Sequence, residues 1–267
     1  MYNKKKSVFG YIENKDDLRS RIKTHSKFGN FNLHKWIKNK FNIQKGSKVL
    51  DLGCGDGSYT KIFKNKVKKN GLIVGVDKNL NLLKVAKKRF KKIPQNISYK
   101  YLNFDKNWKI NHNFDWIFCI YALHHSNNFS QIIYNIKKIL NKNGTLVIIG
   151  PGKKNSEALY NIHYHVTGKK APKTFIKKMG RTEKEFHFKL KKSFNKKYIK
   201  KFIFNYKIFF PQTIAYAKYY WSTLLWRQEM QKLKITRINY YKNRTVKYLT
   251  LKKYKSINKQ TVCLICR

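Results

Sequence analysis

Residues 49–63 read VLDLGCGDGSYTKIF, and this stretch decides the fold. A short apolar run carries an acid, Asp51, and glycines follow at positions 53, 55 and 57 before a helical pattern begins. Glycine is favoured where the backbone takes a positive φ or approaches a ligand closely, because it has no Cβ. The stretch therefore predicts a strand, a tight loop and a helix N-terminus. Open α/β sheets bind nucleotides at such loops, at the carboxyl ends of their strands.

The glycine spacing D-x-G-x-G-x-G differs from the dinucleotide fingerprint G-x-G-x-x-G. It resembles motif I of the class I S-adenosylmethionine-dependent methyltransferases, of the type 11 or small-molecule kind. The resemblance extends over about residues 45–152, because further motifs follow in the order that this family shows. It implies a Rossmann-like α/β fold and S-adenosyl-L-methionine as the cofactor.

Three later strands support the resemblance. The second predicted strand, residues 72–77, ends in Asp77, which can accept both ribose hydroxyls of an adenosine or, alternatively, cap the helix that follows. The third strand is followed by Asn103, where the family usually has an acid that meets the adenine amino group. The pair FD at residues 114–115 and the triplet LHH at 123–125 resemble the family's fourth motif.

The resemblance assigns the cofactor site to residues that follow these strands. The expected cofactor-binding residues are Asp51, Gly53, Cys54, Gly55, Gly57, Asp77, Lys78, Asn103, Phe104, Cys119 and Ile120. Right-handed crossovers between successive βα units predict a mostly parallel sheet. With an antiparallel last strand at residues 261–266, we expect seven strands in the order 3-2-1-4-5-7-6.

The remaining segments suggest a domain organisation. Residues 1–45 are expected to be an N-terminal helical lead-in, and residues 46–267 the methyltransferase domain. Within it, 153–201 and 211–245 are expected to be insertions on the substrate side. A strand is predicted at 202–210 and one aromatic helix at 213–230, whereas 239–253 is too basic to assign.

No catalytic residue is evident from the sequence. His124, His163 and His165 are weak candidates for a general base, and His124 could instead orient the helix that follows it. No metal site is expected. Cys263 and Cys266 stand three apart in a strand and so point to opposite faces, and zinc would need two more ligands.

The charge is strongly positive, with 61 basic and 12 acidic residues and a net charge of +49. A basic surface can bind nucleic acid, anionic lipid or an acidic substrate. However, lysine outnumbers arginine 53 to 8, and asparagine, isoleucine and tyrosine are abundant. These residues share AT-rich codons, so codon drift is the alternative cause, and evolved phosphate sites usually use arginine.

The function expected from the sequence is methyl transfer from S-adenosylmethionine to a small, lipid-like or anionic acceptor, on O, N or C. An RNA methyltransferase is one alternative, although no Asn-Pro-Pro-Tyr-type motif follows the fourth strand. A non-catalytic nucleic-acid-binding protein of the same fold is another. Four cysteines, no apolar run of about 18 residues and no secretory signal make the cytoplasm the expected location.

Overall fold

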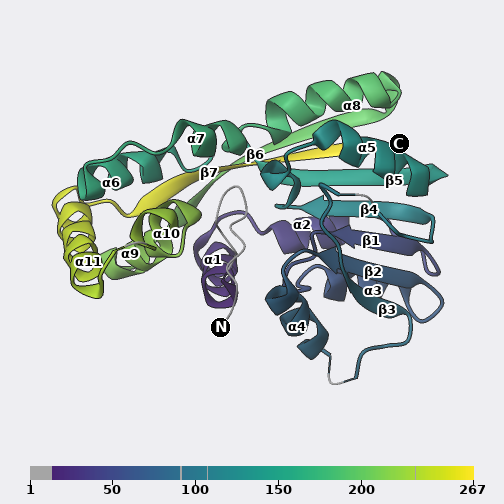
Figure 1. The fold of residues 1–267 in the computed structure, drawn as a ribbon, viewed down its shortest axis with the longest axis horizontal. Helices are drawn as coiled ribbons and strands as arrows, with labels where there is room; N and C mark the ends of the chain where they lie inside the picture. Colours follow the sequence, from purple (N-terminus) through teal and green to yellow (C-terminus); the bar gives the residue numbers. More distant parts are fainter. Residues whose placement is uncertain (1–13, 91, 107, 232) are drawn as a thin grey trace. The chain divides into compact units, whose positions relative to one another are not determined.

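The computed structural model describes residues 14–267 except 91, 107 and 232 (Figure 1). Its contacts divide the chain into two units. The larger unit contains Asn32–Asn155, Ile176–Tyr206 and Lys259–Arg267, and the smaller one contains Met1–Phe31, Ser156–Phe175 and Lys207–Asn258. The first 13 residues of the expected lead-in lie outside the described residues.

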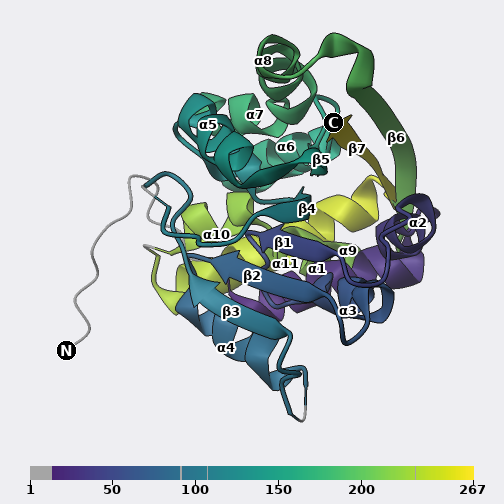
Figure 2. The ribbon, with the colours of Figure 1, turned by 90° about the vertical axis from the view of Figure 1, so that its right-hand side faces the viewer.

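A seven-stranded sheet has the order β3-β2-β1-β4-β5-β7-β6, which confirms the expected topology. Strands β1 to β5 are parallel, and β7 is antiparallel to β5, with Ile149 opposite Cys263. Figure 2 shows β3, β2, β1, β4 and β5 side by side. The strands are β1 Lys48–Leu52, β2 Leu72–Asp77, β3 Ile97–Tyr101, β4 Phe114–Ile120, β5 Leu140–Pro151, β6 Ile199–Phe209 and β7 Ser256–Cys266.

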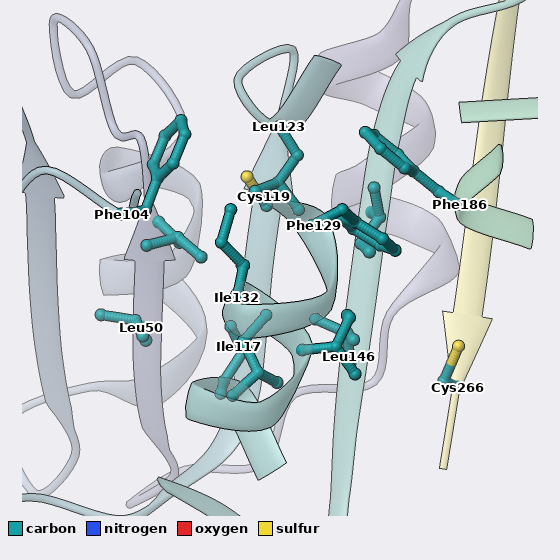
Figure 3. Close-up of a cluster of buried hydrophobic side chains, with 14 of the residues drawn as sticks. Leu50, Phe104, Ile117, Cys119, Leu123, Phe129, Ile132, Leu146, Phe186 and Cys266 are labelled. Atoms are coloured by element: carbon teal, nitrogen blue, oxygen red, sulfur yellow. The ribbon is translucent and has the colours of Figure 1, made fainter. Parts of the chain in front are cut away.

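The sheet of the larger unit is buried on both faces, which explains why its central strands read as continuous apolar runs. Leu50 and Ile117 belong to one core cluster, together with side chains of α5 (Phe129–Ile139) and α8 (His187–Ser193) (Figure 3). Their neighbours Val49 and Phe118 belong to a second cluster. That cluster includes side chains of α2 (Leu33–Lys40), α3 (Thr60–Val67) and α4 (Leu80–Lys88). Alternate residues of each strand therefore pack against different helices.

The fifth strand begins earlier than expected. The sequence predicts a helix to Leu140 and a turn at Asn143-Gly144, but β5 already begins at Leu140. Leu140 pairs with Phe114, and the register shifts between Phe114 and Trp116. The Asp115 carboxylate holds this irregular end, because it accepts hydrogen bonds from the Lys48 amide at 2.8 Å and from Asn141 Nδ2 at 2.6 Å. Because Thr145 pairs with Trp116, residues 141–144 lie opposite Asp115 alone, so the chain bulges out of the ladder at the predicted turn although the strand already begins at Leu140.

The smaller unit is helical, and its helices differ from the expected ones. The single helix expected at 213–230 is two, α9 (Thr213–Trp221) and α10 (Leu224–Met230). The break follows from two hydroxyls: Ser222 Oγ donates to the Tyr219 carbonyl at 2.7 Å, and Thr223 Oγ1 accepts from the Trp226 amide as the N-cap of α10. Such side chains compete with helical hydrogen bonds.

The stretch too basic to assign forms most of α11 (Ile235–Leu251). Thr245 and Leu249 are its buried residues, four apart on one face, while cations occupy much of the exposed surface. The remaining helices are α1 (Lys15–Phe28) and α6 (Glu157–Thr167), with α7 (Lys173–Met179) crossing into the larger unit. Among the helices of the described chain, none has the length and apolar character needed to cross a membrane.

Candidate functional site

The glycine loop connects β1 to α3 in the larger unit, as the sequence predicts. Gly53, Gly55 and Gly57 have φ values of 77°, 55° and 75°, a left-handed conformation that other residues adopt at a cost. The amides of Gly53 and Cys54 both donate to the Val76 carbonyl, at 2.7 and 2.9 Å. The loop is thereby tied to the end of β2.

Gly57 allows the loop to pack closely against two other elements. A Cβ on Gly57 would lie 2.9 Å from Tyr99 Oη on β3 and 3.0 Å from the Ala86 Cβ on α4. The absence of a side chain at Gly57 therefore lets the loop pack against β3 and α4. Among the three, Gly55 is the one whose amide binds a carboxylate, that of Asp77.

Asp77 joins the glycine loop to the start of α4. Its Oδ2 accepts from the Gly55 amide at 2.9 Å, and its Oδ1 accepts from the Asn79 amide at 2.8 Å. Burial raises the pKa of this carboxyl, and the two amide hydrogen bonds oppose the shift. The cap of α4 is Asn79, whose side chain accepts from the Asn81 and Leu82 amides, so the capping alternative for Asp77 is only indirect. Lys78, beside it, is exposed.

Asp51 is a buried carboxyl beneath the loop, 1% exposed. Its Oδ2 accepts a hydrogen bond from Thr60 Oγ1 at 2.9 Å, from the first residue of α3. Burial raises the pKa of Asp51 to about 7, with smaller contributions in the same direction from Asp77 and Asp56, and the Thr60 hydrogen bond opposes them. A buried carboxyl of this kind favours a cationic ligand, because a nearby positive charge stabilises its ionised form.

The raised pKa of Asp51 predicts a pH-dependent stability. The unfolded chain loses this proton above about 3.8, whereas the folded protein keeps it to about 7, so the free energy of unfolding falls as pH rises through that interval. We expect Asp51→Asn to raise the melting temperature of the cofactor-free protein. The gain should grow from about pH 3.8 to about pH 7 and be constant above it, as measured by thermal denaturation. A gain that is equal at every pH would contradict the raised pKa.

Asp56, the second acid of the loop, is already neutralised by the protein. Arg89, just beyond α4, forms an ion pair with its carboxylate and also donates to its backbone carbonyl. Ser58 Oγ donates to Asp56 Oδ1 at 2.6 Å and accepts from Arg89 Nη2 at 2.8 Å. The carboxylate of Asp56 thus stabilises the loop, and Arg89 is a supporting residue that the sequence did not reveal.

The residues after β3 form a turn beside the loop after β4. Asn103 Oδ1 accepts from the Asp105 amide at 3.1 Å, and the Asp105 carboxylate accepts from the Asn127 amide at 2.9 Å. The Phe104 ring is 6% exposed and belongs to the first core cluster (Figure 3). The backbone carbonyl of Phe104 accepts a hydrogen bond from Trp108 Nε1 at 3.1 Å. Asp105 therefore links two of the predicted cofactor-binding segments.

The end of β4 is buried and then turns sharply. Cys119 and Ile120 are 0% and 7% exposed, and burial raises the pKa of the Cys119 thiol. Tyr121 has a φ of 54°, and its amide donates to the Ile149 carbonyl at 2.7 Å. Its hydroxyl bonds to the Thr261 hydroxyl on β7. Tyr121 was missed by the sequence reasoning, although its place directly after the fourth strand is a signal that could have found it.

His124 lies in a short 3-10 turn, Leu123–His125, and is 6% exposed. Within the described chain its Nδ1 has no hydrogen-bond partner. Burial lowers its pKa well below the ordinary value, and His125, Lys178 and Arg181 act in the same direction. The imidazole is therefore neutral at pH 7. The backbone carbonyl of His124 accepts a hydrogen bond from Arg181 Nη1 at 3.3 Å. The helix that follows, α5, is capped by Asn128 and not by His124.

The other two histidine candidates lie in the smaller unit. His163 Nδ1 forms a hydrogen bond with the Tyr220 hydroxyl at 2.8 Å, and burial lowers the pKa of this histidine. His165 stacks on Tyr248, with ring centroids 4.8 Å apart. The structure therefore brings the predicted cofactor-binding residues and His124 together in one unit, and His163 and His165 in the other.

Comparison with known proteins identifies the family of the chain. A family model described as a methyltransferase domain matches residues 43–199, more than half of the chain. The chain is similar to the demethylmenaquinone methyltransferase of Staphylococcus epidermidis, at 24% identity over 194 residues, covering 71% of this chain and 77% of that protein. It is also similar to the ubiquinone/menaquinone biosynthesis C-methyltransferase UbiE of Hydrogenovibrio crunogenus, at 26% identity over 152 residues, covering 55% and 58%.

Solved structures show the same fold. The methyltransferase of Thiobacillus denitrificans in complex with S-adenosyl-L-homocysteine superimposes with a TM-score of 0.56 at 12% identity, covering 96% of this chain and 100% of that one. The Geobacter sulfurreducens methyltransferase complex gives 0.55 at 11% identity, covering 96% and 100%. The family match spans the glycine loop, Asp77 and the strand-four motif. The chain therefore belongs to the methyltransferase-domain family, and it is a class I S-adenosylmethionine-dependent methyltransferase.

Proposed function

We propose that this methyltransferase acts on a small, lipid-like acceptor that carries negative charge or ionises on reaction. The quinone-methylating relatives support a lipid-like acceptor. The observation that carries the anionic character is a group of cations in the larger unit. Lys178, Arg181 and Lys78 are close enough for the latter two to lower the pKa of Lys178 after the larger effect of burial, while Asp105 raises it and Glu185 forms an ion pair with Arg181. These cations would attract an acidic or phenolic acceptor.

The residues of the glycine loop fit the cofactor. S-adenosylmethionine supplies an electrophilic methyl group on a sulfonium. We propose that Asp77 accepts hydrogen bonds from the ribose, that Gly55 permits close approach, and that Asn103 and the Phe104 amide meet the adenine. The buried carboxyl of Asp51 accepts a hydrogen bond from the neutral Thr60 hydroxyl, so a cationic ligand suits it. In the same scheme, Gly53, Cys54, Gly57 and Lys78 form the walls, and Cys119 and Ile120 lie at the methionine end.

The chain contributes mainly alignment and exclusion of water. A base is needed chiefly for an oxygen nucleophile. We propose His124 for that role, because it is neutral at pH 7 and its Nδ1 is unpartnered within the described chain. Arg181 fixes the backbone around it, since it donates to the carbonyls of both His124 and Ser126.

Replacing His124 should separate catalysis from cofactor binding. We expect His124→Ala to change the cofactor Kd by less than about threefold, and to lower kcat by about 100-fold or more if the acceptor atom is oxygen. Titration calorimetry and a labelled-methyl assay measure the two quantities. A loss of cofactor binding comparable to the loss of turnover would show that His124 supports the cofactor site instead.

The proposed function is tested by methyl transfer from labelled S-adenosylmethionine. The acceptor pool is a lysate of the source organism separated into RNA, protein, lipid and small-molecule fractions, with demethylmenaquinone as a defined acceptor. We expect label in the lipid or small-molecule fraction. Label confined to RNA would overturn the proposed acceptor class while leaving the enzyme class intact, and binding without transfer to any fraction would contradict both.

A further inference from the structure

A cavity of about 500 Å³ opens in the larger unit at the amino ends of the parallel strands. Its walls include Phe41, before β1, and Trp116 and Thr145, which lie opposite each other near the starts of β4 and β5. Arg267, directly after the antiparallel β7, completes this edge. The glycine loop follows the carboxyl end of β1. The cavity therefore lies at the opposite edge of the sheet from the cofactor site.

Four of the side chains that line the cavity are cationic, and none of the lining side chains is a carboxylate. Its cations are Lys40, Lys197, Lys200 and Arg267. In the part of the chain that the structure describes, none of these four forms an ion pair. Asp115 is the neighbour of Trp116 in the sequence. Its carboxylate accepts hydrogen bonds from the Lys48 amide and from the Asn141 side chain. Cations that converge on a hollow without a counter-charge concentrate anions there.

Aromatic rings line the same hollow. Trp116 is held edge-on against Phe41, with ring centroids 5.9 Å apart, and stacks on Phe118 at 5.8 Å and 12°. Tyr198 also lines the hollow and is 48% exposed. Aromatic faces next to cations are the combination that binds nucleotides, because the base stacks on a ring while the phosphate meets the charge.

We propose that this cavity is a second ligand site, which binds a nucleotide. The base lies against Trp116 and Tyr198, and the phosphate lies among Lys197, Lys200 and Arg267. A volume of about 500 Å³ is within the range of small-ligand sites, about 300–1,000 Å³. The nucleotide comes either from solution or from a single-stranded RNA. An anionic membrane fits less well, since a concave site does not seat on a flat surface and would hold a lipid-like acceptor at the wrong edge of the sheet.

The test measures binding of UMP by titration calorimetry and tryptophan fluorescence. Saturating S-adenosyl-L-homocysteine is present, so that the adenosyl site is closed. We expect Lys197→Ala/Lys200→Ala to weaken UMP binding by about tenfold or more. The control Lys87→Ala/Lys88→Ala removes the same charge from the exposed side of α4 and should change the Kd by less than about twofold. Both variants should bind S-adenosylmethionine as the wild type does, which verifies folding.

Three further arms identify the ligand. Uridine and inorganic phosphate should each bind at least about tenfold more weakly than UMP, since each lacks one half of the contacts. Trp116→Phe should retain UMP affinity but lose the fluorescence quenching. Oligo(U) that binds more tightly than UMP identifies RNA as the source, and equal affinity identifies the free nucleotide; both support the site.

Other results would overturn the proposal. One is an equal loss of UMP affinity in the Lys197/Lys200 and Lys87/Lys88 double variants, and another is inorganic phosphate that binds as tightly as UMP. The others are fluorescence quenching that persists in Trp116→Phe and no UMP binding at millimolar concentration. Binding of anionic vesicles that depends on Lys197 and Lys200, without UMP binding, would replace the nucleotide by a membrane surface.

Discussion

Gly55→Val should abolish cofactor binding, with a Kd weakened by at least about 100-fold. Two effects combine. Gly55 has a φ of 55°, where a β-branched residue is strained by roughly 1–2 kcal/mol. In the proposed site the added methyl groups would also stand where the cofactor approaches the loop, beside the Gly55 amide that donates to the Asp77 carboxylate at 2.9 Å. Titration calorimetry with S-adenosylmethionine measures the loss.

Gly46→Val is the matched control for backbone strain. Gly46 has a φ of 83° and lies in the turn before β1, where an added Cβ would meet no atom within 4 Å. Valine at position 46 therefore suffers a backbone strain comparable to that of valine at position 55, but at a site away from the glycine loop. We expect Gly46→Val to lower the melting temperature and to bind the cofactor normally. If Gly55→Val bound the cofactor as well as Gly46→Val does, the proposed role of the loop would be wrong.

Asp77→Ala should weaken cofactor binding by about 100-fold or more. The carboxylate holds the Gly55 and Asn79 amides at 2.9 and 2.8 Å, and hydrogen bonds to a charged group contribute about 1.5–3 kcal/mol each. The variant loses this anchor of the loop together with the proposed acceptor for the ribose hydroxyls. Asp77→Asn keeps one acceptor oxygen and should lie between the wild type and Asp77→Ala.

Asp115→Ala controls for the loss of a structural carboxylate. Asp115 also accepts a backbone amide, that of Lys48, at 2.8 Å, but it lies at the opposite edge of the sheet. It should lower stability without a change in cofactor Kd greater than about threefold. Equal weakening of binding by Asp77→Ala and Asp115→Ala would show that Asp77 acts only through the stability of the fold.

The parallel sheet could be predicted because its signals are local. The first two strands are short apolar runs that end at a glycine or an acid, Gly53 after β1 and Asp77 at the end of β2, and the crossover rule then orders the parallel strands. The residues expected around the cofactor also follow strand ends, so topology alone gathers them at one edge. The positions of Asp51, Gly55 and Asp77 next to strand ends are therefore predictable from the sequence.

Other features depend on contacts between distant segments. Thr60 reaches Asp51, and Arg89 reaches Asp56, only because the start of α3 and the end of α4 fold back beside these acids, and no spacing rule predicts such pairs. In α11, frequent lysine and arginine residues obscured a face on which only Thr245 and Leu249 are buried. The break at Ser222-Thr223 was missed because hydroxyls cap a helix only where the chain already turns.

The two units alternate along the chain and exchange at five places, 31/32, 155/156, 175/176, 206/207 and 258/259. A gene interrupted at 155/156, 175/176 or 206/207 would encode neither unit complete, whereas a break at 31/32 leaves the larger unit whole and one at 258/259 leaves the smaller unit whole. Recombination therefore cannot transfer the smaller unit between relatives as one cassette. A chimera that exchanges one continuous half of the chain between relatives, joined at 155/156, 175/176 or 206/207, would build both units from two parents.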